Sequence, residues 1–232
     1  MIVGIHQLHY LPWLRYIHKI LSSDVFIVLD NIQYNKNGHQ NRNRIKTPQG
    51  AATLTVPVFD RLGQRLDEVA IDNKGPWARK HWRSIAQHYR NAPYFPRYAD
   101  WLEEVYSQPW VYLNDLNRSL LTGVLLRLEI ETPVVYASEL KVPGEATERL
   151  IQLIHAVKGD TYLSGAHAVD SYLDVEALEA SGIALQIQSW NAPTYPQGRG
   201  PFLPELSIID LMMHCGPDAR TLLKGVPHDC PQ

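Results

Sequence analysis

Short apolar runs alternate with amphipathic segments in the first part of the chain. Residues 2–5 and 25–29 are apolar runs of the kind that form buried strands, and residues 8–21 between them place apolar side chains on one helical face. Pro12 suits the first position of that helix. Two buried strands joined by a helix normally run parallel, with a right-handed crossover. The pattern therefore predicts a parallel sheet built on these two strands.

A central stretch rich in helical patterns follows, and the strand–helix alternation then returns after residue 132. Strands are expected at residues 51–59, 67–72, 133–136, 161–163 and 183–190, and helices at 77–90, 95–106, 111–128, 145–157, 172–181 and from Ser207. Asp210 stands at the capping-box position of the last helix. These elements predict a single α/β domain over residues 1–232. Its sheet is expected to be mostly parallel and Rossmann-like or nucleotide-binding-like, with a helical insertion at residues 76–128 and a tail at 226–232.

Polar side chains follow the first two predicted strands directly. His6 and Gln7 come after the first strand, and Asp30 and Gln33 after the second. Ligands of open parallel sheets bind beyond the carboxyl ends of the strands. His6, which titrates near neutral pH, and Asp30 are therefore the candidate proton acceptors, and Gln7 would orient a polar group. Caps on buried backbone groups would explain the same residues without any function.

Residues 31–59 contain no acidic residue but carry four cations, Lys36, Arg42, Arg44 and Lys46. A guanidinium grips a phosphate or carboxylate with two parallel hydrogen bonds, which is the chemical reason to place arginine in a binding loop. Residues 34–49 are therefore predicted to form a basic loop that receives an anion. A loop whose charges simply face water is the alternative.

Two later segments are further candidates for ligand contact. Ser164 and Gly165 follow a predicted strand, where they could bind a ligand or form an ordinary turn; a serine nucleophile would also need a base, which no spacing identifies. Tyr195 and Gln197 lie in a loop rich in proline and glycine. This loop is either a lid over the pocket or a surface loop pinned by aromatic residues.

Composition excludes several classes of function. The net charge is −2, so no field of the whole protein attracts nucleic acid or anionic membranes. His6 and His9 lack a third metal ligand, and no phosphate-loop or dinucleotide-binding signature is present. With two cysteines, Cys215 and Cys230, no disulfide framework is predicted and a reducing cytoplasm is expected. No signal peptide or membrane-spanning segment is predicted.

Five short motifs together resemble the WbqC-like protein family, over residues 4–216. They are Gln-x-x-Tyr-Leu-Pro-Trp at 7–13, Asp-x-x-Gln-Tyr at 30–34, Asn-Arg-Asn-x-Ile at 41–45, Tyr-Leu-Ser-Gly at 162–165 and Leu-Ser-x-x-Asp-Leu at 206–211. The chain departs from the family pattern at Leu8, where many members have proline, and at His39-Gln40, where tryptophan often precedes the Asn-Arg pair. Both changes would alter the shape of a pocket.

The resemblance implies a biosynthetic enzyme, because members occur with polysaccharide and other biosynthetic genes and are sometimes described as amino-acyl or glycyl transferases. A transferase acting on an anionic small molecule that bears a nucleotide, carboxylate or phosphate is thus favoured over a non-catalytic metabolite-binding or accessory protein, and over a nucleotidyltransferase-like activating enzyme. His6 and Asp30 are the predicted catalytic residues. The predicted substrate-binding residues are Gln7, Tyr10, Trp13, Gln33, Asn41, Arg42, Asn43, Arg44, Lys46, Ser164, Gly165, Tyr195 and Gln197. No metal ligand is predicted, and neither a cofactor nor an oligomeric state follows from the sequence.

Overall fold

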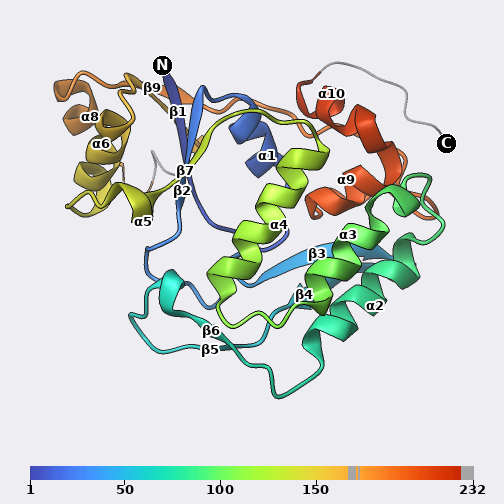
Figure 1. Ribbon diagram of the computed structural model, residues 1–232. Coiled ribbons are helices and arrows are strands. Elements are labelled where there is room, and N and C mark those ends of the chain that lie inside the picture. The colour runs from blue at the N-terminus through green and yellow to red at the C-terminus, as the bar shows by residue number, and fades with distance from the viewer. Residues whose placement is uncertain (167–170, 172, 226–232) are drawn as a thin grey trace. The chain divides into compact units, whose positions relative to one another are not determined.

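The computed structural model describes residues 1–166, 171 and 173–225, and the chain divides into two units. Unit 1 comprises residues 1–7, 18–31 and 131–190, and unit 2 comprises residues 8–17, 32–130 and 191–232. The division falls within helix α1 (Leu14–Leu21). Figure 1 labels most of the elements of both units.

The parallel sheet belongs entirely to unit 1. Its strands are β1 (Ile2–Gln7), β2 (Val25–Leu29), β7 (Val134–Tyr136), β8 (Thr161–Ser164) and β9 (Ala184–Ile187), in the order β7-β2-β1-β8-β9. All four neighbouring pairs are parallel. The chain builds outward from β1 to β2 and β7, and then returns to the other side of β1 for β8 and β9. The predicted parallel α/β sheet is confirmed, and it is doubly wound.

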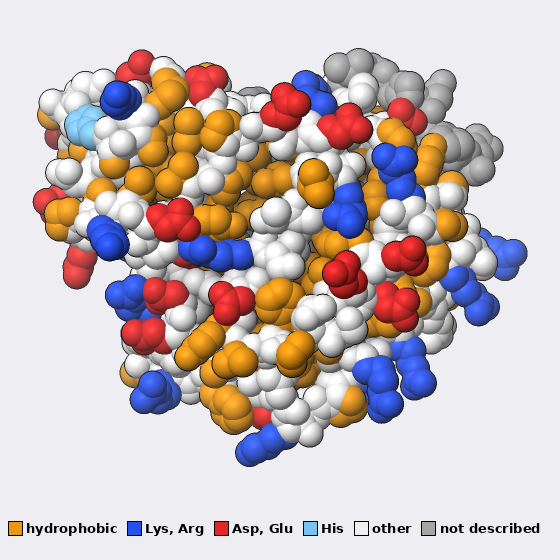
Figure 2. All heavy atoms as spheres, viewed as in Figure 1, with side chains coloured by type: hydrophobic (Ala, Val, Ile, Leu, Met, Phe, Trp, Pro, Cys, Tyr) orange, Lys and Arg blue, Asp and Glu red, His pale blue; other side chains and the backbone are white. Residues whose placement is uncertain are grey.

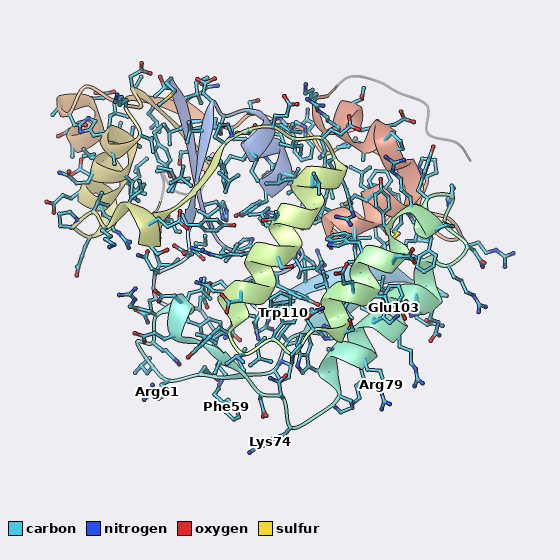
Figure 3. The ribbon with its side chains drawn as sticks, in the orientation of Figure 1. Phe59, Arg61, Lys74, Arg79, Glu103 and Trp110 are labelled. Carbon is cyan, nitrogen blue, oxygen red and sulfur yellow. The ribbon has the colours of Figure 1, made fainter. Side chains whose placement is uncertain are left out.

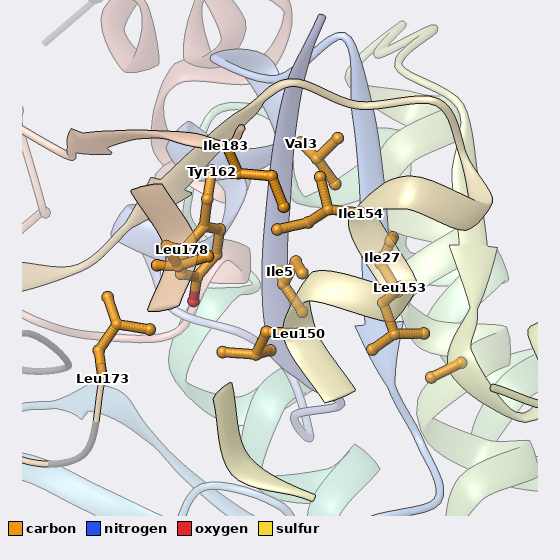
Figure 4. Packing of buried hydrophobic residues seen from close by; sticks show 11 residues of the cluster. Val3, Ile5, Ile27, Leu150, Leu153, Ile154, Tyr162, Leu173, Leu178 and Ile183 are labelled. Atoms are coloured by element: carbon orange, nitrogen blue, oxygen red, sulfur yellow. The ribbon is translucent and has the colours of Figure 1, made fainter. Parts of the chain in front are cut away.

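One face of this sheet forms the core of unit 1. Val3 and Ile5 of β1 and Ile27 of β2 pack against α6 (Ala146–Ala156), as Figure 4 shows, with α5 (Ala137–Leu140) and α8 (Val175–Ala180) adding further apolar side chains. Each of these buried aliphatic side chains contributes roughly 1.5–3 kcal/mol of transfer free energy. On the opposite face, a Cβ at Gly4 would collide with Ser23 Oγ, just after α1. The glycine thus allows that turn to lie directly on the strand.

Unit 2 contains two small antiparallel sheets and the helical insertion. One sheet pairs β3 (Arg42–Thr47) with β4 (Gly50–Thr55), and the other pairs β5 (Val58–Phe59) with β6 (Ala70–Ile71), which follows the 3-10 turn η1 (Leu66–Glu68). The insertion is α2 (Trp77–Tyr89), α3 (Phe95–Ser107) and α4 (Leu113–Arg127), as predicted. After residue 190 come α9 (Ile208–Cys215), the 3-10 turn η2 (Gly216–Asp218) and α10 (Ala219–Leu223).

Several local predictions are wrong. Residues 51–59 belong to two strands of separate sheets, β4 and β5, and the strand expected at 67–72 is reduced to β6, because residues 66–68 form a 3-10 turn. The helix after β1 begins at Leu14, because residues 8–13 form a buried irregular turn in which Leu11 has a left-handed backbone, with φ of 43°. Residues 42–47 are a strand rather than part of a basic loop, since Asn43 and Ile45 point into the interior. Asp210 does not complete a capping box, because its carboxylate accepts hydrogen bonds from two tyrosines.

The cysteines and the helices bear on the expected compartment. Cys215 is buried at the end of α9, and the absence of a disulfide framework stays a prediction. Cys230 and the predicted tail lie outside the described residues. Within the residues that the structure describes, no helix is both long enough and apolar enough to cross a membrane.

Candidate functional site

The predicted site residues fall into two groups, one in each unit. Unit 1 contains His6, Gln7, Asp30, Ser164 and Gly165, all at the carboxyl ends of strands β1, β2 and β8. The ten others belong to unit 2: Tyr10, Trp13, Gln33, Asn41, Arg42, Asn43, Arg44, Lys46, Tyr195 and Gln197. Within unit 2, Gln33 is exposed and forms an isolated backbone bridge with Arg65.

Asp30 caps a helix in unit 1. Its buried carboxylate accepts hydrogen bonds from the backbone N–H of Ser138 at 2.9 Å and from the Ser138 hydroxyl at 2.7 Å, at the start of α5. The neighbouring Asn31 accepts a hydrogen bond from Arg149 on α6. Asp30 therefore holds the chain that follows β2 against the chain that follows β7. Its role as a proton acceptor stays a prediction.

Ser164 and Gly165 end β8 in a turn. The buried Ser164 hydroxyl donates to the Gly165 carbonyl at 3.2 Å, and the Ser164 carbonyl accepts from the Gln188 N–H at 2.7 Å. A Cβ at Gly165 would meet no atom within 4 Å. The geometry is that of a strand-end turn whose backbone is open to an approaching group, rather than that of an activated nucleophile.

Four aromatic rings gather in unit 2, and we call His9, Trp13, Tyr16 and His39 the Trp13–His39 cluster. The ring centroids of Trp13 and His39 lie 4.8 Å apart, and His9 lies 5.3 Å from Tyr16 and 5.5 Å from His39. Such spacings are typical of favourable ring contacts. Trp13 and His39 are half-buried, so part of each ring remains open to solvent.

Two arginines flank this cluster. Burial, together with Arg44 and Arg42, lowers the pKa of His39, so that its imidazole is neutral at pH 7. Arg42 donates to the carbonyl of Lys36 and to the Asn37 side chain, whereas Arg44 forms an exposed 3.6 Å ion pair with Glu205. An exposed pair of this kind is worth about 0–1 kcal/mol. Arg44 can therefore exchange Glu205 for a ligand at low cost.

Two buried polar atoms, one in the cluster and one on a flanking arginine, lack a hydrogen bond. Within the described part of the chain, His39 Nδ1 and Arg42 Nε have no hydrogen-bond partner. Each such buried atom costs roughly 1–3 kcal/mol relative to a bonded one. A ligand that supplied partners would recover part of that free energy.

The asparagines of the Asn-Arg-Asn motif shape the chain around the cluster. Asn43 Nδ2 donates to the carbonyl of Leu11 at 2.5 Å, and Asn41 Nδ2 donates to the carbonyl of Val56 at 2.9 Å. The first bond holds the left-handed turn that leads into Trp13. Both side chains are buried and act through the backbone, although they are predicted to contact a substrate.

Tyr10 is buried in a second polar group of unit 2. Its hydroxyl lies 2.8 Å from His81 Nδ1 and 2.5 Å from the Tyr106 hydroxyl. His81 lines a cavity of about 380 Å³, and burial lowers its pKa to about 4. The spacing of His81 from Trp77, Ile85 and Tyr89 on α2 is the sequence signal for its buried position.

The loop before α9 is pinned from within unit 2. The Tyr195 and Tyr89 hydroxyls both donate to the fully buried carboxylate of Asp210, at 2.9 Å and 2.7 Å. The Gln197 side chain donates to the Leu203 carbonyl and accepts from the Leu203 N–H. The Lys46 ammonium donates to the carbonyl of Pro201 at 2.8 Å. Tyr195, Gln197 and Lys46 therefore anchor the loop, which is the second of the two interpretations of this segment.

The part of unit 2 around β5 and β6 exposes several large apolar side chains. Figure 2 shows hydrophobic groups at this surface, and the exposed residues there are Phe59, Leu62, Val111 and Tyr112. The Lys74 ammonium lies 5.7 Å from the centre of the Phe59 ring, and both are labelled in Figure 3. A cavity of about 660 Å³ lies beside them, lined by Val58, Phe59, Asp60, Arg61, Gln64, Glu68, Ala70 and Tyr112.

Comparison with known proteins places the chain in a family. The model of the WbqC-like protein family matches residues 7–222. The chain belongs to the WbqC-like protein family. It is 35% identical over 226 residues to the uncharacterized protein Rv1507c of Mycobacterium tuberculosis (strain ATCC 25618 / H37Rv). The matched segment covers 96% of this chain and 97% of the mycobacterial protein. No solved structure matches the chain. Among the described residues of this WbqC-like protein, no group of three or more His, Cys, Asp and Glu side chains is arranged to hold a metal ion.

Proposed function

We propose that the protein is a biosynthetic transferase that holds an anionic small-molecule substrate at the Trp13–His39 cluster. The observation that carries the proposal is the pair of buried atoms, His39 Nδ1 and Arg42 Nε, that have no partner in the described chain. They lie in a group with two arginines and a half-buried tryptophan. Unsatisfied polar atoms beside exposed aromatic surface are features that ligand sites share.

The chemistry of the cluster favours a particular class of substrate. Arg42 and Arg44 suit a phosphate or a carboxylate, because a guanidinium binds either group through two hydrogen bonds. The Trp13 ring would cover a planar or apolar part of the same molecule. A neutral imidazole at His39 could accept a proton from an attacking amine or hydroxyl. Amino-acyl or glycyl transfer is the finer form of this proposal, and the family resemblance supports it.

A non-catalytic metabolite-binding protein is the second candidate, and one observation favours it. Both carboxylate oxygens of Asp30 accept hydrogen bonds from Ser138. The helix cap accounts for this carboxylate without a catalytic role. A binding protein would use the same cluster without converting its ligand.

A thermal-shift screen of the full chain tests the binding site. Nucleotides, nucleotide-sugars, amino acids and acyl-CoA compounds would be added to the wild type and to Arg42→Ala. Arg83→Ala is the matched control, because it removes the same charge from the exposed face of α2. We expect a ligand that raises the melting temperature of the wild type and of the control. In Arg42→Ala its affinity should fall at least tenfold, or by about 1.4 kcal/mol.

The outcome also separates the two candidates. A ligand that binds all three proteins equally would refute the cluster as the anion site. Mass spectrometry of a genuine ligand, after incubation with amine and hydroxyl acceptors, shows whether a group has been transferred. Transfer supports the transferase, whereas an unchanged ligand supports the binding protein.

A further inference from the structure

The sheet of unit 1 reverses its winding direction between β1 and β8. The chain moves from β1 to β2 and β7 on one side, and from β8 to β9 on the other. At such a switch point the connections that leave the two central strands turn to opposite faces of the sheet, which opens a crevice at the carboxyl ends. This rule predicts the ligand crevice of the sheet where β1 and β8 end.

A backbone acceptor at this point lacks its strand partner. The ladder between β1 and β8 ends with the pair Gly4 and Leu163. The Met1 carbonyl accepts from Thr161 on the β8 side, and the Ile2 carbonyl accepts from Asp24 on the β2 side. Since the direction alternates along a strand, the Ile5 carbonyl points to the β8 side. One more step of the ladder would pair this carbonyl with the N–H of Gly165.

Lys19 occupies that place. Its ammonium donates to the Ile5 carbonyl at 3.1 Å, and the residue is 4% exposed. No ion pair forms between Lys19 and any acidic side chain in the described part of the chain. A buried ammonium bonded to a single carbonyl lacks both a counter-charge and partners for its other protons. Burial accordingly lowers its pKa to about 8.

We propose that Lys19 is the counter-charge for an anionic oxygen group of a ligand, bound between the carboxyl ends of β1 and β8. The open backbone at Gly165, where a Cβ would meet nothing within 4 Å, lets that group approach closely. The ladder between β1 and β8 ends before the N–H of Gly165, so this N–H does not pair with the Ile5 carbonyl. This site lies wholly in unit 1 and is independent of the proposed function at Arg42, so the two ideas can fail separately.

The test compares pyrophosphate with malonate as probes of the full chain at pH 7. The melting temperature would be measured for the wild type, Lys19→Met and Arg42→Ala. Lys158→Met is the matched control, because Lys158 is an exposed lysine of the same unit. At tenfold excess over the dissociation constant we expect a rise of about 3 °C in the wild type and in the control. The rise should persist in Arg42→Ala and disappear in Lys19→Met.

The probes also distinguish the kind of anion. A response to pyrophosphate alone indicates a phosphoryl group, and a response to malonate alone indicates a carboxylate. A shift that survives in Lys19→Met but is lost in Arg42→Ala would assign the anion to the Trp13–His39 cluster and overturn the Lys19 site. The absence of any shift in the wild type with either probe would overturn it as well.

Nuclear magnetic resonance of the wild type keeps the idea testable if Lys19→Met does not fold. Lysine labelled with carbon-13 would give one side-chain signal that titrates near pH 8, which identifies Lys19. A bound anion favours the charged ammonium, so pyrophosphate should raise this titration midpoint by at least about one pH unit. A midpoint that does not move at millimolar pyrophosphate contradicts the proposal.

Discussion

Replacing Lys19 with methionine would measure the free energy that a buried ammonium costs unit 1. The pKa of Lys19 falls from 10.5 to about 8 through burial, and a difference of this size corresponds to about 3 kcal/mol at neutral pH. Methionine keeps the length of the side chain without the charge. It loses the hydrogen bond to the Ile5 carbonyl, which costs about 1–2 kcal/mol. At pH 7 we therefore expect Lys19→Met to be more stable than the wild type by roughly 1–2 kcal/mol.

The cost of the buried ammonium depends on pH, because Lys19 loses its proton at a lower pH in the native state than in the unfolded state. Below pH 8 the ammonium is protonated in both the native and the unfolded state, so the full cost applies. Between about pH 8 and 10.5 the unfolded chain still binds the proton while the native state has released it. The stability of the wild type therefore rises with pH in this window. The advantage of Lys19→Met should shrink by about 2 kcal/mol between pH 7 and pH 10.

Urea unfolding followed by circular dichroism at pH 7 and pH 10 would test this for the wild type, Lys19→Met and Lys158→Met. The comparison uses differences between variants, because tyrosines and other groups that titrate at high pH are the same in each protein. An advantage that is equal at both pH values would show that Lys19 keeps an ordinary pKa. A variant less stable than the wild type at pH 7 would show that its charge is compensated. Either result refutes the reasoning.

Two further predictions concern unit 2. Because burial lowers the pKa of His81 to about 4, the unfolded chain binds a proton between about pH 6.5 and 4 that the native state does not. Stability should therefore fall by about 3 kcal/mol as the pH decreases through this window, and acid titrations of His81→Gln should show most of that dependence removed. Asn43→Ala should lower the free energy of unfolding in urea by about 2–3 kcal/mol, because the Leu11 carbonyl loses its buried donor. A loss no larger than that of Asn37→Ala, at an exposed asparagine, would contradict the role of Asn43.

The sheet was predictable because its central strands are covered on both faces. Such strands have continuous apolar sequences, and the runs at residues 2–5 and 25–29 can be recognised from the local sequence alone. The start of α1 was not predictable in this way. Leu8, Tyr10 and Leu11 are all buried in an irregular turn, so their apolar character reflects burial on every side and not a helical face.

Residues 42–47 were predicted as part of a loop but form a regular element, the strand β3. Asn43 and Ile45 are buried while Arg42 and Arg44 are half-buried, and this alternation is the period of a strand. An interpretation based on charge alone does not use this period. The strand instead places Arg42 and Arg44 on one side, where both act on His39.

The candidate sites were predictable only where a motif marked them. Trp13 and Arg42 follow from motifs and Arg44 from the stretch without acidic residues. His39 joins the cluster through packing between segments more than twenty residues apart, which no local pattern reveals. Lys19 was missed for a different reason. A lysine on an amphipathic helix is ordinarily solvated, and no local pattern reveals that the β1–β8 ladder ends where the Ile5 carbonyl accepts from Lys19.

The interleaving of the two units also constrains how the nascent chain matures. β1 is synthesised more than a hundred residues before β8, which covers its second edge. At roughly 5–20 residues per second, that edge waits about 10–30 s for its partner. An open edge strand is a template for pairing with other chains. Expression of this protein should therefore depend on chaperones that shield the first strands until the second half of the sheet has been synthesised.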